Sequence, residues 1–520
     1  MRKHALIIGS GINSLTAAVL LVRSGYRVTI FEKNDWFGGN ILTKELSVPG
    51  FRHEIFSGFH PLFTTGPFYR ELREELEKEG LEYLNTQYTA GVLLPDGRSV
   101  VLRDGREATA AALEELDTAD GHAYRSVMEA FDTRADLAFG LLSTELYSLA
   151  GAGLAARGLY QLGAEEMLEF MGEALPTARK WLDNTFRSEV IKACLAPWTL
   201  HTGMGPDDAG GSLMLRIILA SFENTGMPVP RGGGSELVKI LIKIIRDNGG
   251  SCHTGRVVDR IIVEDGKATG VEVSGELHPA DLVLANVSPT ALYRQLLPEI
   301  TVPESIRSQA GDYRYGRANM QIHLSLARPP RWPNPDLLQA GMVHVTPGMN
   351  GTSRAVNEAI RGLLPAEPTI VVGQHTAIDP SRAPEGRWTI WIQLQELPAY
   401  PSGDSLGKIV CHGEWTEAVA EAYADRVIER LALQLPGLRE DILERHVLSP
   451  AELARINPNL VGGDPYCGTA SLDQFLFWRP LPNLRGHDTP VPSVYHIGAA
   501  THPGPGLSGT SGYLVAKQLL

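Results

Sequence analysis

The first forty residues of this chain restrict its fold more than any other segment does. An apolar run at residues 5–8 leads into Gly9-Ser-Gly11, a stretch with helical spacing follows, and a second apolar run spans residues 28–31. That second run ends on Glu32, and the glycine pair Gly38-Gly39 follows shortly. Strand, glycine turn, helix, strand and acid in this order are typical of the unit that binds the ADP half of a dinucleotide. The sequence therefore predicts an α/β fold that opens with a dinucleotide site.

Each residue type in this unit has a physical role. Gly9 permits the tight turn out of the strand, and Gly11 lets the backbone approach the diphosphate. The helix that begins near Ile12 directs its free N–H groups and its positive end at the phosphates. Glu32 is placed to accept hydrogen bonds from the adenosine ribose. Ser14 stands where the usual G-x-G-x-x-G pattern has its third glycine, and it is small enough for close packing of helix on strand.

Length, charge and cysteine content narrow the class of protein. At 520 residues the chain exceeds what one hydrophobic core usually supports, so we expect two domains. With 47 basic and 60 acidic residues the net charge is −13, which argues against a general surface for nucleic acid or anionic lipid. The four cysteines lie far apart and form no C-x-x-C pair. We therefore expect reduced thiols, a cytoplasmic protein and no disulfide redox mechanism.

Two segments bear on export and membrane insertion. The first strand begins within five residues of Met1, so we expect no signal peptide. Residues 137–156 are the nearest candidate for a membrane span, but they include Glu145 and several Gly, Ser and Tyr residues. We therefore expect these residues to form helices of a substrate domain.

The middle of the chain alternates between helical and strand-like patterns. Residues 85–225 are predicted to be mainly helical, because apolar residues recur at spacings of three and four. A glycine run at 232–234 precedes a clear helix, and strands at 257–263, 268–273 and 280–286 follow. Residues 296–464 mix strands with a long helix at 414–435.

The end of the chain repeats the order of strand, glycine-rich loop and helix. A short strand at 494–497 leads into GAATHPGPGLSG and then into a terminal helix. A second helix N-terminus directed at the same cofactor would hold the rest of the diphosphate and the flavin end. Together with Gly38-Gly39, this loop favours FAD over NAD. We therefore predict a Rossmann-like FAD-binding domain assembled from residues 1–85, 226–295 and 465–520, and a second α+β substrate-binding domain from residues 86–225 and 296–464.

The sequence resembles the FAD-dependent phytoene desaturase-like oxidoreductases, a branch of the flavin amine oxidase superfamily. Within that branch it is most similar to the group called pyridine nucleotide-disulphide oxidoreductase domain-containing protein 2. The resemblance extends over the whole chain, and the two end motifs are shared widely among FAD enzymes. The segments that are more specific to this group are PRGGGSELVKIL, ADLVLANVSP, IDPSRAPEG and SLDQFLFWRPLP.

The resemblance implies a set of cofactor contacts. The diphosphate would be bound by Gly9, Gly11, Asn13 and Ser14. The adenosine ribose would be near Glu32, the adenine near the backbone of Val258, and the ribityl chain near Gly39 and Asn40. Further cofactor-binding residues would be Ser10, Ile12, Lys33 and Gly38. The flavin end would be framed by Gly498, Thr501, His502, Gly509, Thr510 and Ser511.

Flavin chemistry needs few acid–base groups, because the cofactor itself accepts the hydride. The sequence shows no Ser-His-Asp set, and we expect no metal site. His502, inside the C-terminal loop, and His60, in the aromatic segment GFHPLF, are the candidate catalytic residues. Trp478-Arg479 could contact substrate, but ordinary packing is the favoured role for this pair.

Three functions are compatible with this sequence. The leading hypothesis is an FAD-dependent dehydrogenase or desaturase that removes two hydrogens from an apolar, unsaturated or alicyclic small molecule by hydride transfer to flavin N5. The alternatives are a flavin amine oxidase acting on a C–N bond, and a flavin-stabilised interaction protein with little turnover. Because no second G-x-G-x-x-G unit is present for NAD(P), we expect oxygen, a quinone or a protein carrier as electron acceptor. No nucleic-acid partner is expected; peripheral membrane contact and a homo-oligomer remain open.

Overall fold

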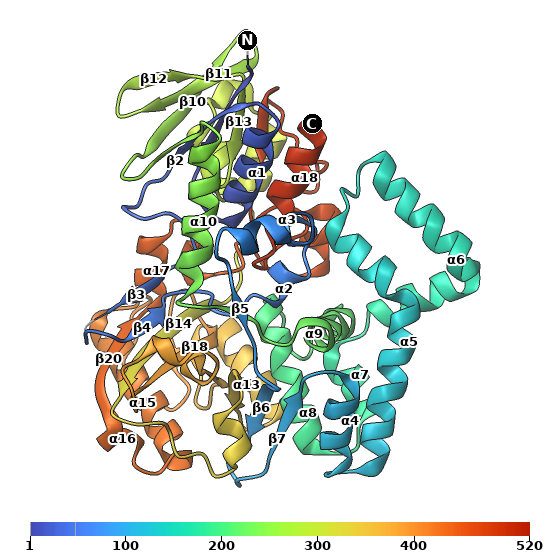
Figure 1. Ribbon diagram of the computed structural model, residues 1–520, viewed down its shortest axis with the longest axis vertical. Coiled ribbons are helices and arrows are strands. Elements are labelled where there is room, and N and C mark those ends of the chain that lie inside the picture. Colours follow the sequence, from blue (N-terminus) through green and yellow to red (C-terminus); the bar gives the residue numbers. More distant parts are fainter. Residues whose placement is uncertain (1, 47) are drawn as a thin grey trace.

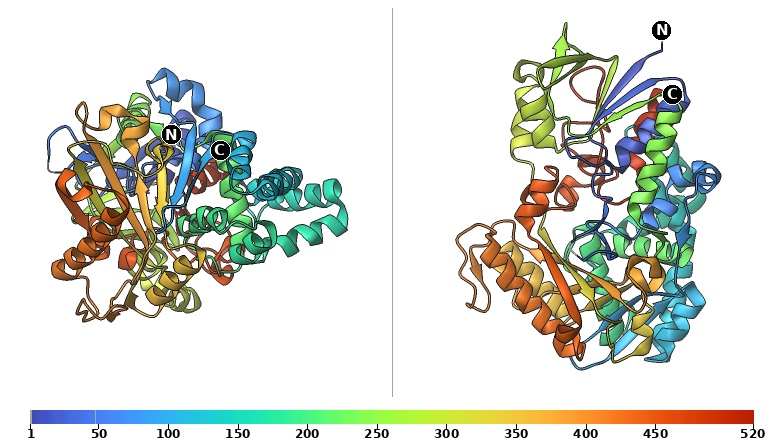
Figure 2. Two further views of the ribbon diagram at one scale, coloured as in Figure 1. Left: turned by 90° about the horizontal axis from the view of Figure 1, so that it is seen from below. Right: turned by 60° about the vertical axis from the view of Figure 1, so that its left-hand side comes forward.

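A computed structural model describes residues 2–46 and 48–520 and has an α/β fold with two main sheets (Figure 1). A five-stranded sheet lies near both termini, at the top of Figure 1, and a seven-stranded sheet lies towards the opposite end. To one side, helix α6 (Leu149–Ala174) forms an arm that extends away from the rest of the molecule, and the preceding helix α5 (Thr118–Ser143) packs against the body (Figures 1 and 2).

The five-stranded sheet is entirely parallel and is assembled from distant parts of the chain. Its strands, in spatial order, are β21 (Val494–His496), β13 (Leu282–Ala285), β1 (His4–Ile8), β2 (Arg27–Phe31) and β9 (Ser251–His253). Strand β1 is buried along its whole length, because both faces of the sheet are covered. The apolar run at the start of the sequence is therefore continuous rather than alternating.

Different elements cover the two faces of this sheet. Ala5 and Ile7 pack in a core with helices α1 (Ile12–Arg23), α3 (Pro67–Lys78), α10 (Gly234–Asp247) and α18 (Thr510–Leu519). Leu6 and Ile8 pack on the other face in a core with an antiparallel sheet. That sheet consists of β10 (Val258–Glu264), β11 (Lys267–Val273) and β12 (Glu276–Pro279).

The seven-stranded sheet is mixed. Its strands, in spatial order, are β20 (Ile442–Leu448), β14 (Ala318–Leu326), β18 (Trp388–Leu397), β17 (Ile370–Gly373), β15 (Met342–Val345), β6 (Tyr88–Leu93) and β7 (Ser99–Arg103). Only the β15–β6 pair is parallel among these strands. The long helix α15 (Glu417–Gln434) packs against the apolar face of this sheet.

The expectation that residues 85–225 are mainly helical misses a hairpin. Strands β6 and β7 lie within this range and form one edge of the seven-stranded sheet. The turn at Pro95-Asp-Gly97 joins them, and the N–H of Gly97 donates to the carbonyl of Leu94 at 2.9 Å. Because β6 is almost completely buried between β15 and β7, its sequence lacks the polar–apolar alternation of a half-exposed strand.

Residues 137–156 belong to the end of α5 and the start of α6, as the sequence predicts. Helix α6 bends at Gly163, where φ is 80°. Across the described parts of the chain, every helix is too short or too polar to cross a membrane. The strands of the two main sheets fall within the ranges predicted for two domains, and the boundaries between those domains stay a prediction.

Candidate active site

The cofactor-binding candidates lie at one edge of the parallel sheet. Gly9 follows β1, Glu32 follows β2, Asn286 follows β13, and Gly498 comes shortly after β21. Because parallel strands end at the same edge, four distant segments meet there. A cavity of about 1320 Å³ opens at this edge and continues between the two sheets.

The glycine turn leaves no room for side chains. Gly9 has a φ of +85°, and a Cβ added there would lie 3.3 Å from the carbonyl oxygen of Asn286. A Cβ on Gly11 would lie 3.1 Å from Nδ2 of Asn286, and one on Gly39 would lie 2.9 Å from Cα of Gly11. Helix α1 begins directly after Gly11 without a side-chain cap. Its first N–H groups are therefore available to an anion.

Glu32 organises the turn from the neighbouring strand. Its Oε2 accepts hydrogen bonds from the backbone N–H of Ser10 at 2.9 Å and from the Ser10 hydroxyl at 2.7 Å, and its Oε1 accepts from the N–H of Asn34 at 2.9 Å. The Ser10 hydroxyl oxygen accepts from the N–H of Gly38 at 3.1 Å. A carboxylate has about four acceptor positions, so Glu32 keeps capacity for a ribose hydroxyl.

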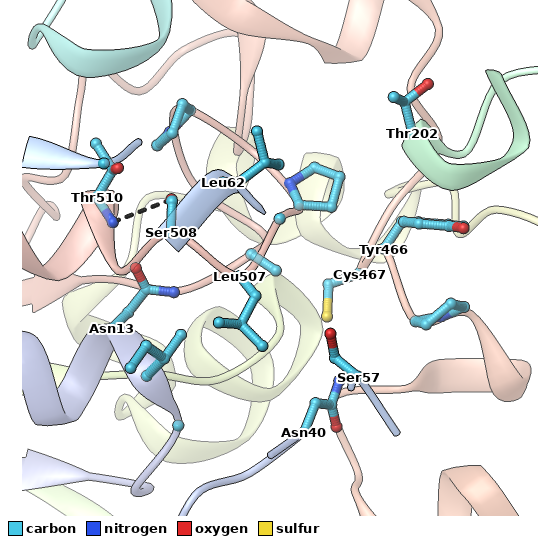
Figure 3. A pocket seen from close by; sticks show the side chains of 18 of the residues that line it. Asn13, Asn40, Ser57, Leu62, Thr202, Tyr466, Cys467, Leu507, Ser508 and Thr510 are labelled. Atoms are coloured by element: carbon cyan, nitrogen blue, oxygen red, sulfur yellow. Dashed lines mark hydrogen bonds between the residues drawn. The ribbon is translucent and has the colours of Figure 1, made fainter. Parts of the chain in front are cut away.

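A second helix N-terminus lies at the same cavity. Helix α18 follows Gly509, which has a φ of +72° and provides no side-chain cap. The N–H of Thr510 donates to the Ser508 hydroxyl at 3.2 Å (Figure 3). A Cβ on Gly512 would lie only 1.8 Å from the carbonyl oxygen of Asn13, so α18 packs directly on α1. Figure 3 shows Asn13 and Thr510 on one side of the cavity and Tyr466 and Thr202 on the other.

The structure brings most of the predicted cofactor residues to the cavity wall. Those that line the cavity are Gly9, Ser10, Gly11, Ile12, Asn13, Glu32, Lys33, Gly38, Gly39, Asn40, Val258 and Thr510. The predicted residues outside the wall are Ser14, Gly498, Thr501, His502, Gly509 and Ser511. Several of these support the wall from behind: Ser511 Oγ accepts from the N–H of Gly498 at 2.9 Å, and Ser14 Oγ accepts from Nδ2 of Asn286 at 2.9 Å.

Neither candidate catalytic histidine reaches the cavity wall. The Nε2 atom of His502 lies 3.0 Å from the carbonyl oxygen of Thr144, and burial lowers the pKa of His502 to about 4. The Nδ1 atom of His60 lies 2.9 Å from the Tyr83 hydroxyl, and burial lowers the pKa of His60 to about 3. Both rings are therefore neutral near pH 7, and a catalytic role for either stays a prediction. The neighbour of Trp478, Arg479, is almost fully buried and donates to the carbonyl oxygens of Ala499 and Tyr466, which is a packing role.

Asn286 is the main cofactor-site residue that the sequence analysis did not single out. It lines the cavity and ties β13 to α1 through its hydrogen bond to Ser14. A Cβ added at Gly9, Gly11 or Gly498 would contact this one residue. A local signal was present, because Asn286 is the first polar residue after the buried run LVLA.

The far end of the cavity is lined by aromatic and neutral polar side chains. Trp198, His201 and Tyr466 lie there with Trp391 of β18. The Nε2 atoms of His201 and His344 are 3.0 Å apart, and burial lowers the pKa of His201 to about 3. This imidazole is therefore neutral at physiological pH, and this end of the cavity provides hydrogen-bonding groups and rings rather than charge.

The residues at the sheet edge fit FAD. A glycine turn without room for a Cβ and the uncapped N-terminus of α1 suit a diphosphate, while Glu32 suits a ribose. The fold and the site thus define an FAD-dependent oxidoreductase. The model of the family described as flavin containing amine oxidoreductase matches residues 15–387, and the chain belongs to that family.

Three curated proteins illustrate the similarity. The chain is 27% identical to the mouse pyridine nucleotide-disulfide oxidoreductase domain-containing protein 2, over 98% of this chain and 91% of the mouse protein. It is 24% identical to one of the subunits of limonene dehydrogenase from Castellaniella defragrans, over 98% and 93% of the two chains. It is also 24% identical to the phytoene desaturase of Fusarium fujikuroi, over 100% and 90%. The resemblance to phytoene desaturase-like oxidoreductases is thereby confirmed.

The solved structures support the fold. The crystal structure of an oxidoreductase from Methanosarcina mazei superposes with a TM-score of 0.62 at 17% identity, covering 99% of this chain and 100% of that one. At this level of identity the likeness concerns the fold alone.

Proposed function

We propose that this protein is an FAD-dependent dehydrogenase that converts a C–C single bond of a largely apolar, alicyclic or unsaturated substrate into a double bond. The observation that carries the proposal is one cavity that reaches from the glycine turn to an aromatic, weakly charged wall. Its volume of about 1320 Å³ exceeds the ~300–1,000 Å³ typical of a site for one small ligand. A cofactor and a substrate can therefore share it.

The apolar part of the cavity comes from several elements. Its walls include Phe59, Leu62, Phe139, Leu154, Ile217, Phe222 and Met342. Helix α6 contributes Leu154, Arg157 and Gly158, so the arm covers part of the cavity. Such walls exclude water and bind a hydrocarbon skeleton through the hydrophobic effect.

The proposed chemistry assigns limited tasks to the protein. Bound FAD supplies a hydride acceptor at N5. The turn at Gly9–Gly11, the N-terminus of α1 and Glu32 would hold the ADP half, and the segment at Gly38–Asn40 with the N-terminus of α18 would hold the rest. With FAD bound, the substrate would lose one hydrogen as hydride and the neighbouring one as a proton, which would leave through the mouth of the cavity. Oxygen, a quinone or a protein carrier would take up the two electrons.

Anaerobic flavin reduction tests this proposal. Purified protein with bound flavin is mixed without oxygen with an alicyclic olefin, a cyclic ketone or a matched amine, and the flavin absorbance is followed while product masses are measured by mass spectrometry. Bleaching with a product two hydrogens lighter supports dehydrogenation. Bleaching by the amine alone, with an imine or its hydrolysis product, would establish amine oxidation instead. If none of these compounds reduces the flavin, the result would favour an interaction protein with little turnover.

A further inference from the structure

One face of the seven-stranded sheet carries a row of carboxamides at the end of the cavity. Asn319 and Gln321 stand at alternate positions of β14, and Gln393 and Gln395 at alternate positions of β18. The two strands are antiparallel neighbours, with Gln321 directly opposite Gln393. All four residues line the cavity, and we call them the amide face.

The amide face places carboxamide side chains at buried positions of the sheet. The side chains of Asn319, Gln321 and Gln395 are 1%, 3% and 2% exposed. The intervening residues, such as Met320 and Ile392, point to the opposite face of the sheet and form the apolar core with α15. Because a buried carboxamide is unfavourable without hydrogen bonds, three of them on one patch require polar partners.

The chain supplies only some of those partners. Trp391 Nε1 donates to Gln321 Oε1 at 3.3 Å, and Gln395 Nε2 donates to the Tyr466 hydroxyl at 2.9 Å and to Gln393 Oε1 at 3.4 Å. These bonds use the carbonyl oxygens of Gln321 and Gln393, so their NH₂ groups remain as donors. Both polar atoms of Asn319, and Oε1 of Gln395, are buried without a hydrogen bond of good geometry among the described residues, and the Asn319 carboxamide lies near the Tyr466 hydroxyl.

No charged side chain of β14 or β18 lines the cavity, although Arg317 and Asp464 lie near Tyr466, a hydrogen-bond partner of this face. The charged residues that line the described cavity lie on other elements: Glu32, Lys33, Arg70, Asp136, Arg157 and Arg256. His201, at the same end of the cavity, is neutral at physiological pH. An ammonium or a carboxylate buried here would find no counter-charge among the cavity-lining residues of β14 and β18, which is costly in the interior. A neutral group that accepts hydrogen bonds fits the free NH₂ donors of Gln321 and Gln393.

We propose that the amide face binds a carbonyl oxygen of the substrate, as a ketone or a carboxamide. The proposal rests on the proposed dehydrogenation and makes it more specific: the substrate is an apolar skeleton with a neutral carbonyl at one end, and neither a pure hydrocarbon nor an amine. The carbonyl at the amide face fixes which C–C bond lies beside the cofactor. N–H donors at a carbonyl oxygen also stabilise the negative charge that develops there when the adjacent C–H is lost as a proton.

A series of ligands on one ring tests the proposal. The flavin-loaded protein is titrated with an alkylcyclohexane and with the corresponding ketone, carboxamide, carboxylate and amine, and binding is followed by the flavin absorbance and by tryptophan fluorescence. We expect the ketone and the carboxamide to bind about tenfold or more tightly than the hydrocarbon, because the hydrocarbon leaves buried amides unpaired. The charged members are expected to bind more weakly than the ketone.

A variant and its matched control test whether the amide face causes the preference for the ketone. Asn319→Leu should remove most of the preference for the ketone, because the ketone loses a polar neighbour and the hydrocarbon no longer leaves this amide unpaired, while the flavin content stays the same. Gln161→Leu makes an amide-to-apolar change elsewhere in the same cavity wall, on α6, and should leave the preference unchanged. If Asn319→Leu does not fold, Gln393→Leu is the replacement, because Gln393 is only half-buried.

The outcomes separate this inference from the proposed function. Equal affinity for ketone and hydrocarbon, tighter binding of the amine or carboxylate, or equal weakening of all ligands by Asn319→Leu would overturn the amide-face proposal, even if a hydrocarbon reduces the flavin. A ketone that binds tightly through Asn319 but never reduces the flavin would support the amide face and overturn the dehydrogenase.

Discussion

Arg382 offers the sharpest test of how the two sheet regions are held together. Its side chain has no exposed surface, and its Nη1 donates to Glu54 Oε1 at 2.6 Å while its Nε donates to Asp379 Oδ2 at 2.8 Å. Its Nη2 donates to the carbonyl oxygen of Pro230 at 3.0 Å. The cluster joins strand β4 (Arg52–Glu54), the segment before α10 and residues 379–382.

Replacing Arg382 by Met would leave two buried carboxylates without their cation. Removing one partner of a fully buried ion pair costs about 3–5 kcal/mol. Arg430→Met is the matched control, because Arg430 pairs with Glu367 at 2.9 Å with both side chains partly exposed, and such pairs contribute about 0–1 kcal/mol. Urea denaturation followed by circular dichroism and by release of flavin fluorescence should show a clearly lower midpoint for Arg382→Met alone.

Two results would refute this reasoning. One is the same urea midpoint for Arg382→Met and Arg430→Met. The other concerns a triple variant that adds Glu54→Gln and Asp379→Asn to Arg382→Met. Because neutral amides need no counter-charge, this variant should recover part of the lost stability. No recovery would mean that lost packing, rather than uncompensated charge, causes the effect.

Three further changes probe the site and its surroundings. Gly11→Val should abolish flavin retention, because its side chain would contact Asn286 and block the diphosphate; full flavin occupancy in the purified variant would contradict the assignment. Gly512→Ala should weaken flavin retention by pushing α18 from α1, measured as flavin released on dilution, and unchanged release would count against the packing argument. His502→Ala should retain flavin and slow its reduction by substrate; an unchanged rate would exclude His502 from catalysis. Finally, burial in the folded protein lowers the pKa of several histidines below their ordinary value of 6.5. As pH falls, these histidines therefore take up protons in the unfolded chain before they do so in the folded protein. The stability of the folded protein should therefore be greatest above pH ~6.5 and should decline towards pH ~4. A urea midpoint that rises on acidification would contradict this. The histidines concerned are His60 and His201, with a pKa of about 3, and His53, His496 and His502, with a pKa of about 4.

The parts of the fold that could be predicted are those with a local pattern. The β1–α1–β2 unit follows from an apolar run, a glycine turn and a helical spacing, all within a short stretch, and α10 follows from its apolar spacing and flanking glycines. The hairpin β6–β7 could not be assigned as easily. Its burial depends on β15, which lies far away in the sequence, so the run TAGVLL carries no alternation that distinguishes a strand from a buried helix.

The candidate site shows the same division. The glycine turn and Glu32 are placed by their own neighbours in sequence, and the structure puts them at the cavity. His60 and His502 are candidates because they lie inside promising motifs, but the direction of a ring depends on tertiary contacts, here with Tyr83 and Thr144. The amide face has no sequence signal at all, because Asn319 and Gln395 share one face only through the pairing of two strands that are distant in the chain.

The order of the strands in the parallel sheet has a consequence for synthesis of the chain. Strand β1 leaves the ribosome first, but its neighbour β13 is made only after residue 281, and β21 and α18 are the last elements to emerge. At about 5–20 residues per second, the first glycine turn therefore waits tens of seconds for the helix that packs on it. During that time the apolar surface of β1 and α1 has only part of its final cover, and a nascent chain that stops before residue 494 cannot complete the cofactor site.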